Sequence, residues 1–212
     1  MAATSRYDDP CGIARAMDVI GDRWAVLVVR ELVFGAKRFA QLRAGLQGIS
    51  PNVLSQRLRE LEAAGVVRRT VLEPPANVAV YELTDRGRAL EPVLIELGRW
   101  GSREQITSQR DLSVSALLLA LKTVFDPAAA RDARYVVRLE GDTFTITVAD
   151  GALGIERGPA PDADVVLDTD AATLRAVAFG RLPLAAAEAE GLLRVTGDRR
   201  LAARFGRLFP VP

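Results

Sequence analysis

Histidine is absent from the 212-residue sequence, and cysteine and lysine are scarce: Cys11, Lys37 and Lys122 are the only examples. Without an imidazole, the chain lacks histidine-assisted serine or cysteine nucleophiles and most zinc and non-haem iron sites. A single thiol excludes an intrachain disulfide and a cysteine-built zinc site, while a bond between two chains remains open. We therefore expect no catalytic residues, no metal and no cofactor, and we predict that the chain is not an enzyme.

Long hydrophobic runs are also missing. Charged residues interrupt the apolar ones every few positions, and no stretch approaches the roughly 18 residues that a membrane-spanning helix needs. The first ten residues, MAATSRYDDP, contain neither an apolar core nor a small-residue cleavage site. Because 49% of the residues are hydrophobic, a packed core is expected. These features predict a folded, soluble, cytoplasmic protein with no membrane partner.

Charge is nearly balanced over the whole chain, with a net value of +1, but it is unevenly distributed. Between Lys37 and Arg69, seven basic side chains stand against two acidic ones, whereas residues 101–212 contain 14 basic and 15 acidic side chains. A local positive patch on a nearly neutral protein is typical of a module that binds phosphates.

The first hundred residues show the pattern of short helices followed by a hairpin. Apolar spacing and glycine positions predict helices over residues 13–20, 24–34, 39–46, 51–64 and 84–100, and strands over 66–72 and 78–83. The helix over 51–64 is the best defined, because Ser50 is a good N-cap, Pro51 occupies the favoured first position and Gly65 closes the helix.

That helix has two chemically different faces. Its leucines recur at i, i+4 and i+7 and are expected to face the core. The opposite face carries short or bidentate hydrogen-bonding side chains, namely Asn52, Ser55, Gln56 and Arg59. Asparagine and glutamine can pair with adenine, arginine with guanine, and serine with either base, from within a major groove. The alternative is an ordinary amphipathic helix whose outer face is merely solvated.

Flanking basic residues favour the DNA-reading interpretation. Arg57 lies at the side of the helix, where a phosphate is the more suitable partner, and Lys37 and Arg38 precede the shorter helix over residues 39–46. That helix and its tight turn supply the first half of a helix-turn-helix, and the proline-turned hairpin after the second helix is suited to be its wing.

The second half of the chain has a different pattern. Residues 102–110 are polar and are predicted to be a linker between an N-terminal domain over 1–101 and a C-terminal domain over 111–212. We predict helices over 114–125, 171–179 and 198–209, and strands over 135–139, 144–148, 153–156, 165–167 and 192–195. The predicted fold class is therefore α+β, with a winged helix-turn-helix followed by an α+β domain.

The segments CGIARAMDVIGDRWAVLVVREL, RFAQLRAGLQGISPNVLSQRLRELEAAGVVRR and YELTDRGRALEPVLIELGRWG together resemble the HxlR family of bacterial winged-helix regulators, relatives of the MarR type. The resemblance covers about residues 11–101. It implies a homodimer on an inverted-repeat operator in double-stranded DNA, with helix 51–64 in the major groove and the terminal helices in the dimer contact. The residues predicted to contact DNA are Lys37, Arg38, Ser50, Asn52, Ser55, Gln56, Arg57, Arg59 and Arg68.

The sequence differs from the family pattern at the wing. In members of the family, the wing prolines are usually followed by an arginine that enters the minor groove, whereas in this sequence they are followed by residues 76–79, ANVA. Cys11 aligns with a cysteine that responds to oxidants in some members. Cys11 is thus either a redox-sensing thiol or a small apolar residue at the dimer contact.

In the C-terminal half, YVVRLEGDTFTITVADGALGI, ADVVLDTDAATLRAVAFGRL and GLLRVTGDRRLAARFGRLF resemble the sterol-carrier-protein type 2 fold. Such domains commonly enclose an apolar tunnel between sheet and helices, which implies a hydrophobic small molecule as a partner. The residues predicted to line such a pocket are Leu117, Leu121, Phe125, Phe144, Ile146, Leu174, Val177 and Phe179. The alternative is that the same side chains fill a solid core.

Three hypotheses follow. The leading one is a homodimeric, sequence-specific transcriptional regulator whose C-terminal domain binds a hydrophobic effector or supports the dimer. The second is a lipid carrier or sequestering protein, dimerised by a winged helix that does not bind DNA. The missing wing arginine is its only support. The third, an enzyme, is disfavoured by the absence of histidine.

Overall fold

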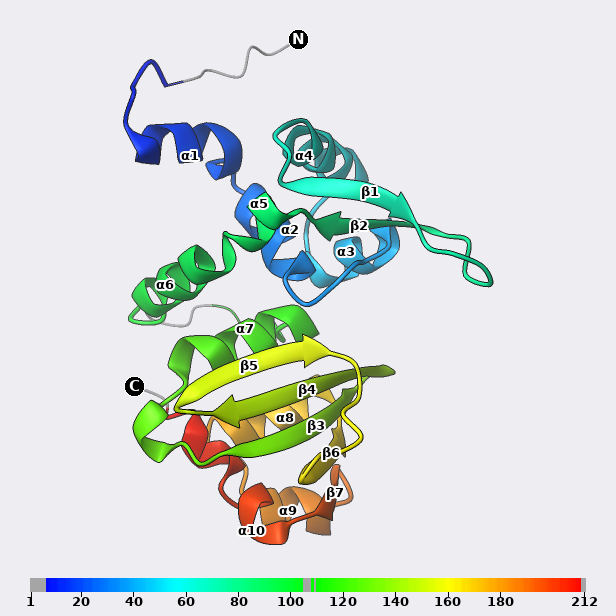
Figure 1. Cartoon of the computed structure of the whole chain (residues 1–212), viewed down its shortest axis with the longest axis vertical. Helices are drawn as coiled ribbons and strands as arrows, with labels where there is room; N and C mark the ends of the chain where they lie inside the picture. Colours follow the sequence, from blue (N-terminus) through cyan, green and yellow to red (C-terminus); the bar gives the residue numbers. More distant parts are fainter. Residues whose placement is uncertain (1–6, 105–107, 109, 211–212) are drawn as a thin grey trace. The chain divides into compact units, whose positions relative to one another are not determined.

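A computed structural model describes residues 7–104, 108 and 110–210 (Figure 1). The contacts within the chain define two compact units, which meet between Leu94 and Ile95. This boundary lies inside one helix, α6 (Glu91–Gly101), and precedes the predicted linker at 102–110. Four residues of that linker lie outside the described part, so its role as a linker remains a prediction.

The N-terminal unit is built from short helices and one antiparallel hairpin. Its helices are α1 (Gly12–Ile20), α2 (Ala25–Leu32), α3 (Phe39–Gly45), α4 (Pro51–Ala63) and α5 (Asp85–Arg88). The hairpin consists of β1 (Val67–Val71) and β2 (Ala79–Leu83). The core is formed mainly by leucine and valine side chains of α2, α3, α4 and the hairpin, among them Val28, Leu42, Leu54, Leu58 and Val80.

The prediction of a single helix over residues 84–100 is wrong, because α5 and α6 are separate helices. Thr84 caps α5 by accepting a hydrogen bond from the N–H of Gly87 at 3.1 Å. Pro92, the second residue of α6, has no N–H to donate and would clash with the carbonyl of residue 88 in a continuous helix. The chain therefore leaves the first helix and starts again at Glu91.

The C-terminal unit contains a five-stranded mixed sheet. Its strands are β3 (Ala133–Leu139), β4 (Asp142–Ala149), β5 (Ala152–Arg157), β6 (Val165–Thr169) and β7 (Leu193–Gly197), in the order β5-β4-β3-β6-β7. Neighbours are antiparallel except β3 and β6, which run parallel. The helices are α7 (Val114–Val124), α8 (Ala171–Ala178), α9 (Leu184–Ala189) and α10 (Arg199–Ala202), with short 3-10 turns at Pro127–Ala129 (η1) and Phe205–Leu208 (η2).

Two differences from the predicted helices have local causes. α9 was not predicted because alanine dominates its six residues, so no apolar spacing marks it, although alanine strongly favours the helix. The helix predicted over 198–209 is instead α10 followed by η2. Gly206 lies against α8 so closely that a Cβ there would be 2.8 Å from the carbonyl oxygen of Val177. This close approach requires a glycine and coincides with the tighter 3-10 turn.

The two faces of the sheet differ in character, as strand alternation requires. On β4, Phe144, Ile146 and Val148 are buried and face the helices α7 and α8, which lie behind the sheet in Figure 1. The alternate residues of β4 are threonines on the opposite face. The helices and sheets of the two units confirm the predicted α+β fold class.

A bilayer-spanning helix would need a long apolar segment, and none of the helices in the described ranges is long and apolar enough to cross a membrane.

Candidate nucleic-acid interface

The helix-turn-helix consists of α3 and α4. Ser50 begins α4 by accepting a hydrogen bond from the N–H of Val53 through its Oγ at 3.3 Å, and Pro51 occupies the first helical position. Leu54, Leu58 and Leu61 are all but fully buried, so they fix which face of α4 points outward. The predicted N-cap, helix start and buried face of this segment agree with the structure.

The outward face of α4 carries the predicted base-reading side chains. Asn52, Gln56 and Arg59 are exposed and Ser55 is half-buried. Arg59 donates from Nη2 to Oε1 of Gln56 at 2.5 Å, and Gln56 donates from Nε2 to Oε1 of Glu60 at 2.6 Å. This chain of hydrogen bonds holds the long side chains along the helix surface in the absence of DNA, and it leaves further guanidinium donors of Arg59 for an outside acceptor.

Two of the predicted DNA-contacting arginines are ion-paired within the protein. Arg57 pairs with Asp22, in the turn between α1 and α2, and with Glu60 at 2.6 Å. Arg68 on β1 pairs across the hairpin with Glu82 at 2.9 Å. Arg57 lies at the side of α4 and Arg68 lies on the wing. A DNA phosphate that contacts either guanidinium group would have to displace the carboxylate partner or bind beside it.

Lys37 has a structural partner that sequence reasoning missed. Its Nζ lies 2.7 Å from Oε2 of Glu31, and Arg30 lies 2.8 Å from the other carboxylate oxygen. Glu31 is completely buried on α2 although it is charged. The backbone of Lys37 also exchanges two hydrogen bonds with Tyr81 on β2, at 2.9 and 2.8 Å. Lys37 therefore joins α2, the start of α3 and the wing at one point.

The buried carboxylate of Glu31 also determines how closely α3 can approach. A Cβ built on Gly45, the last residue of α3, would lie 2.4 Å from Oε2 of Glu31. A side chain at residue 45 would require the carboxylate of Glu31 to move away from its present position. In sequence, Glu31 looks like one more polar residue of an amphipathic helix, so nothing local marks its burial.

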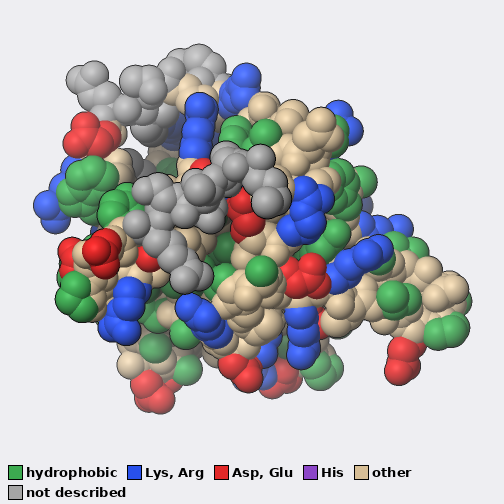
Figure 2. Space-filling view, turned by 90° about the horizontal axis from the view of Figure 1, so that it is seen from above, with side chains coloured by type: hydrophobic (Ala, Val, Ile, Leu, Met, Phe, Trp, Pro, Cys, Tyr) green, Lys and Arg blue, Asp and Glu red, His purple; other side chains and the backbone are tan. Residues whose placement is uncertain are grey.

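The wing is the hairpin of β1 and β2 with its connecting loop. The loop contains a cis peptide between Pro74 and Pro75, and Asn77 adopts a positive φ of 39°. Val71 and Leu72 are exposed on this hairpin. In Figure 2 the hairpin projects to the right, and its far end shows hydrophobic and acidic side chains. The wing tip therefore carries no basic side chain, as residues 73–79 of the sequence indicate.

Val53 is a further candidate that the sequence analysis did not select. It lies in the first turn of α4, next to Asn52, and is 38% exposed. An apolar side chain at this position suits the methyl group of thymine. The available signal was its place outside the leucine spacing, since a valine there does not belong to the buried stripe.

The predicted pocket residues of the C-terminal unit lie on the helix-covered side of the sheet. Six of them are buried: Leu117, Leu121, Phe144, Ile146, Leu174 and Val177. The other two, Phe125 and Phe179, are partly exposed. The ligand pocket that these residues are predicted to line, and the alternative of a solid core, both remain predictions.

Beside them, an aromatic cluster extends from the sheet into η2. The rings of Tyr135 and Phe205 are 5.2 Å apart between centroids, as are those of Phe205 and Phe209. Burial raises the pKa of Tyr135, while the positive charge of Arg204 acts in the opposite direction.

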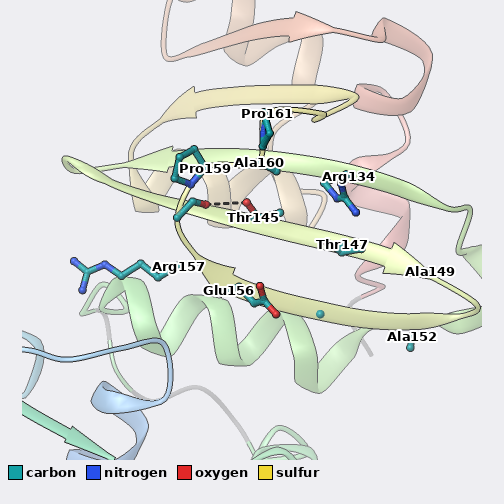
Figure 3. A pocket seen from close by; sticks show the side chains of 12 residues that line it. Arg134, Thr145, Thr147, Ala149, Ala152, Glu156, Arg157, Pro159, Ala160 and Pro161 are labelled. Carbon is teal, nitrogen blue, oxygen red and sulfur yellow. Dashed lines mark hydrogen bonds between the residues drawn. The ribbon is translucent and has the colours of Figure 1, made fainter.

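A separate groove of about 580 Å³ lies on the other face of the sheet (Figure 3). Thr145 and Thr147 of β4 form its floor, and residues 158–161 form one wall, held by the hydroxyl of Thr145, which donates to the carbonyl of Gly158 at 2.8 Å. At one end Arg134 forms an ion pair with Asp162, and the hydrogen bond from Arg134 lowers the pKa of that carboxyl group. None of the eight predicted pocket residues lines this groove.

Cys11 is exposed and occupies the N-cap position of α1, and its N–H donates to Asp9 at 2.8 Å. Both interpretations of this thiol remain predictions. Among the residues that the structure describes, no group of three or more Asp, Glu or Cys side chains is placed to hold a metal ion.

Two helices presenting a hydrogen-bonding face, followed by a hairpin wing, define a winged helix-turn-helix DNA-binding protein. The model of the HxlR-like helix-turn-helix family matches residues 19–109, and that of the SCP-2 sterol transfer family matches residues 115–210. The chain belongs to the HxlR-like helix-turn-helix family and carries an SCP2 domain at its C-terminal end. The two predicted resemblances are thus confirmed.

Similar proteins match the N-terminal part of the chain. "Uncharacterized HTH-type transcriptional regulator YvaP" of Bacillus subtilis is 44% identical over 89 residues, which cover 42% of this chain and 82% of the relative. A regulator of the same description from Synechocystis, sll1512, is 43% identical over 93 residues, covering 43% of this chain and 68% of the relative. The reduced form of the transcriptional regulator YodB from B. subtilis shares 32% identity over 47% of this chain and 98% of that chain, with a TM-score of 0.41. The family match and the two sequence relatives support a role of the chain in DNA-binding transcriptional regulation.

Proposed function

We propose that the protein binds an inverted-repeat operator in double-stranded DNA as a homodimer, with α4 of each protomer in a major groove. The outward face of α4 is the observation that carries this proposal. Asn52, Gln56 and Arg59 offer donors and acceptors suited to base edges, and Ser55 and Val53 adjoin them. The proposed contacts to the phosphate backbone come from Lys37 and Arg38 before α3, Ser50 and Arg57 at the start and side of α4, and Arg68 on β1. A cytoplasmic location, where bacterial DNA lies, belongs to the same proposal.

A genomic binding experiment tests the operator. Purified protein is incubated with fragmented genomic DNA, the bound fragments are sequenced, and the recovered site is footprinted. We expect a protected inverted repeat with half-sites about one helical turn, roughly 34 Å, apart. Recovery of fragments without a shared sequence at low ionic strength would contradict the proposal. That outcome would favour the second hypothesis, a carrier protein whose winged helix does not bind DNA.

The homodimer is supported by an apolar stripe on α6. Val93, Leu97 and Trp100 recur at i, i+4 and i+7 and are exposed, with Trp100 at 67%. On α1, Ile13 and Met17 are likewise exposed at one-turn spacing. Contiguous exposed apolar side chains of this kind mark protein contacts. Both helices are terminal helices of the winged helix, where the family resemblance implies the dimer contact.

Replacing Leu97 by aspartate is expected to shift the protein from dimer to monomer, because it places a charge in the stripe that the partner covers. Sedimentation velocity at micromolar concentration measures the change. Val71→Asp is the matched control: Val71 is also an exposed apolar residue, but it lies on the wing. The control should remain dimeric. A dimer that survives Leu97→Asp as well would place the contact elsewhere.

The absence of a basic residue at the wing tip predicts that adding one will increase DNA affinity. Ala76→Arg, directly after the wing prolines, is expected to raise DNA affinity, because it supplies a cation to a tip that has none. The slope of log K against log salt should steepen by about 0.9 for one added phosphate contact. Ala76 is preferred to Asn77 because the positive φ at Asn77 disfavours arginine. An unchanged slope would show that the tip does not reach DNA, and Ala76→Gln serves as the uncharged control.

We propose further that a hydrophobic small molecule in the C-terminal unit modulates DNA binding. The support is the match to the SCP-2 sterol transfer family together with the buried apolar side of the sheet. Palmitate and cholesterol are suitable probes. We expect a probe that binds to change operator affinity by about 5- to 150-fold, because a ligand shifts the DNA-binding equilibrium by its different affinity for the two states. Proven binding with unchanged operator affinity would remove the effector role.

A further inference from the structure

A second concentration of positive charge lies near the end of the chain. Between Arg194 and Arg207 there are five arginines and one acidic residue, Asp198. The near-neutral balance of the whole C-terminal half conceals this segment. By the same criterion that marks residues 37–69, a short window with a large excess of basic side chains predicts a surface that binds phosphates.

Three of these arginines share one side of a helical segment. α10 continues into η2 through Ala203 and Arg204, which both have right-handed helical backbone angles. Phe205 and Leu208 are buried and Leu201 is half-buried, so these residues define the inner side of the segment. Each of these three residues is directly preceded by an arginine, namely Arg200, Arg204 and Arg207, so the arginines lie along a neighbouring side of the segment. We call these three arginines the arginine ridge.

The positive charge of the ridge is not neutralised by carboxylates within the described residues. No ion pair involves Arg200, Arg204 or Arg207, whereas the neighbouring Arg199 lies 2.6 Å from Glu188. Asp198, the nearest carboxylate in sequence, caps α10 by accepting hydrogen bonds from the N–H groups of residues 200 and 201, at 2.7 and 3.1 Å. Arg200 and Arg207 are exposed and Arg204 is half-buried, so the ridge presents at least its two exposed guanidinium groups to an outside anion.

The shape of the ridge suits a polyanion better than a single small anion. The first and last of the three arginines are seven helical steps apart, which is about 10 Å at 1.5 Å per residue. Phosphates of one DNA strand follow each other every 3.4 Å along the duplex axis, so this length faces about three of them. Arginine is the side chain that recognises phosphate in a bidentate manner.

A membrane surface fits less well. Amphipathic helices that bind bilayers place large apolar side chains beside their cations and insert them among the lipids. In this segment Phe205 and Leu208 are buried inside the domain, so they are not available for insertion. DNA, in contrast, is the partner that the N-terminal unit of the same chain binds, and tethering raises its effective concentration at the ridge.

We propose that the arginine ridge of the SCP2 domain is a second DNA-contacting surface, which binds the phosphate backbone without regard to sequence. The inference rests on the proposed function only in that the winged helix brings DNA to the molecule. It assigns to the C-terminal unit a contribution to affinity that is separate from ligand binding.

The test compares two triple variants of the full chain on a 60-base-pair duplex of arbitrary sequence, between 50 and 200 mM KCl. The ridge variant is Arg200→Gln/Arg204→Gln/Arg207→Gln. The control, Arg138→Gln/Arg157→Gln/Arg175→Gln, removes the same charge from arginines that are paired with Asp168, Asp142 and Asp111. Fluorescence anisotropy gives the slope of log K against log salt, and thermal melting checks that both variants fold.

We expect the ridge variant to lose about 2.7 from the magnitude of the slope per bound chain, at about 0.9 per phosphate contact. This equals about a 40-fold smaller fall in affinity across the salt range. The control should keep the wild-type slope. If the ridge variant melts early, Arg200→Gln/Arg207→Gln, which changes only the two exposed arginines, replaces it and is expected to lose about 1.8 from the slope.

Equal slopes for wild type and ridge variant, or equal losses in ridge variant and control, would overturn the proposal. So would a ridge variant that loses binding to phosphatidylserine vesicles while its DNA slope is unchanged, since the surface would then bind lipid. If instead the proposed binding to an operator is wrong, the result differs. The wild-type protein would then show no preference for any DNA sequence, but the slope of log K against log salt on arbitrary DNA would still depend on the ridge.

Discussion

Substitution of Lys37 by methionine is expected to lower the free energy of unfolding by about 3 kcal/mol, a large effect for a side chain that is 19% exposed. The substitution removes the Lys37 cation from the buried carboxylate of Glu31, which Arg30 also contacts. Removing one partner of a buried ion pair is costly because the other charge stays desolvated. Urea denaturation at neutral pH measures the change.

The reciprocal substitution should cost less. Glu31→Gln leaves Lys37 and Arg30, whose side chains are partly exposed and can be rehydrated. In the double variant Glu31→Gln/Lys37→Met neither charge is stranded, so it should be more stable than Lys37→Met alone. Arg38→Met removes the adjacent, exposed cation and serves as the control, with an expected change within about 0.5 kcal/mol. Equal stability of Lys37→Met and the control would refute the structural role of the pair.

Arg59→Ala is expected to reduce affinity for the operator by about 10- to 100-fold, which corresponds to the loss of one good base contact. Arg59 is exposed on the outward face of α4, and Gln56 orients its guanidinium group. Affinity for a scrambled duplex should change little, so the ratio of the two dissociation constants at one salt concentration is the quantity to measure.

Arg38→Ala provides the contrast. Arg38 is exposed immediately before α3, and its N–H donates to Oε1 of Gln41 at 2.8 Å. A phosphate-contacting residue contributes equally to all sequences, so this variant should weaken operator and scrambled DNA alike and flatten the salt slope by about 0.9. If both variants lose the same affinity on both duplexes, the division into base-reading and phosphate-contacting residues is wrong.

Much of the N-terminal unit could be predicted because its signals are local. Ser50, Pro51 and the leucine spacing specify where α4 begins and which face is buried, and the prolines mark the wing. The same local logic fails at Thr84, where the capping residue suggests one long helix and Pro92, eight residues later, divides it. From sequence alone, a proline in the first turn of a helix cannot be distinguished from one in the helix interior unless the residue at which the helix begins is known.

The partners of the charged side chains could not be predicted, because they depend on the tertiary fold. Arg57 meets Asp22 across 35 positions of the sequence, and the burial of Glu31 depends on the approach of α3. In the C-terminal unit, strand alternation predicts which residues of β4 face inward. It contains no information on the parallel pairing of β3 with β6, which determines the sheet order.

The contact between Glu31 and Gly45 links two positions that are 14 residues apart in sequence. A methyl group at position 45 would overlap the carboxylate, so a side chain can enter there only if the end of the Glu31 side chain shifts or residue 31 becomes shorter. Gly45→Ala and Glu31→Ala should each be harmful, yet together they should partly compensate. Among homologous regulators, we therefore expect the two positions to covary, with a bulkier residue at one accompanied by a smaller residue at the other.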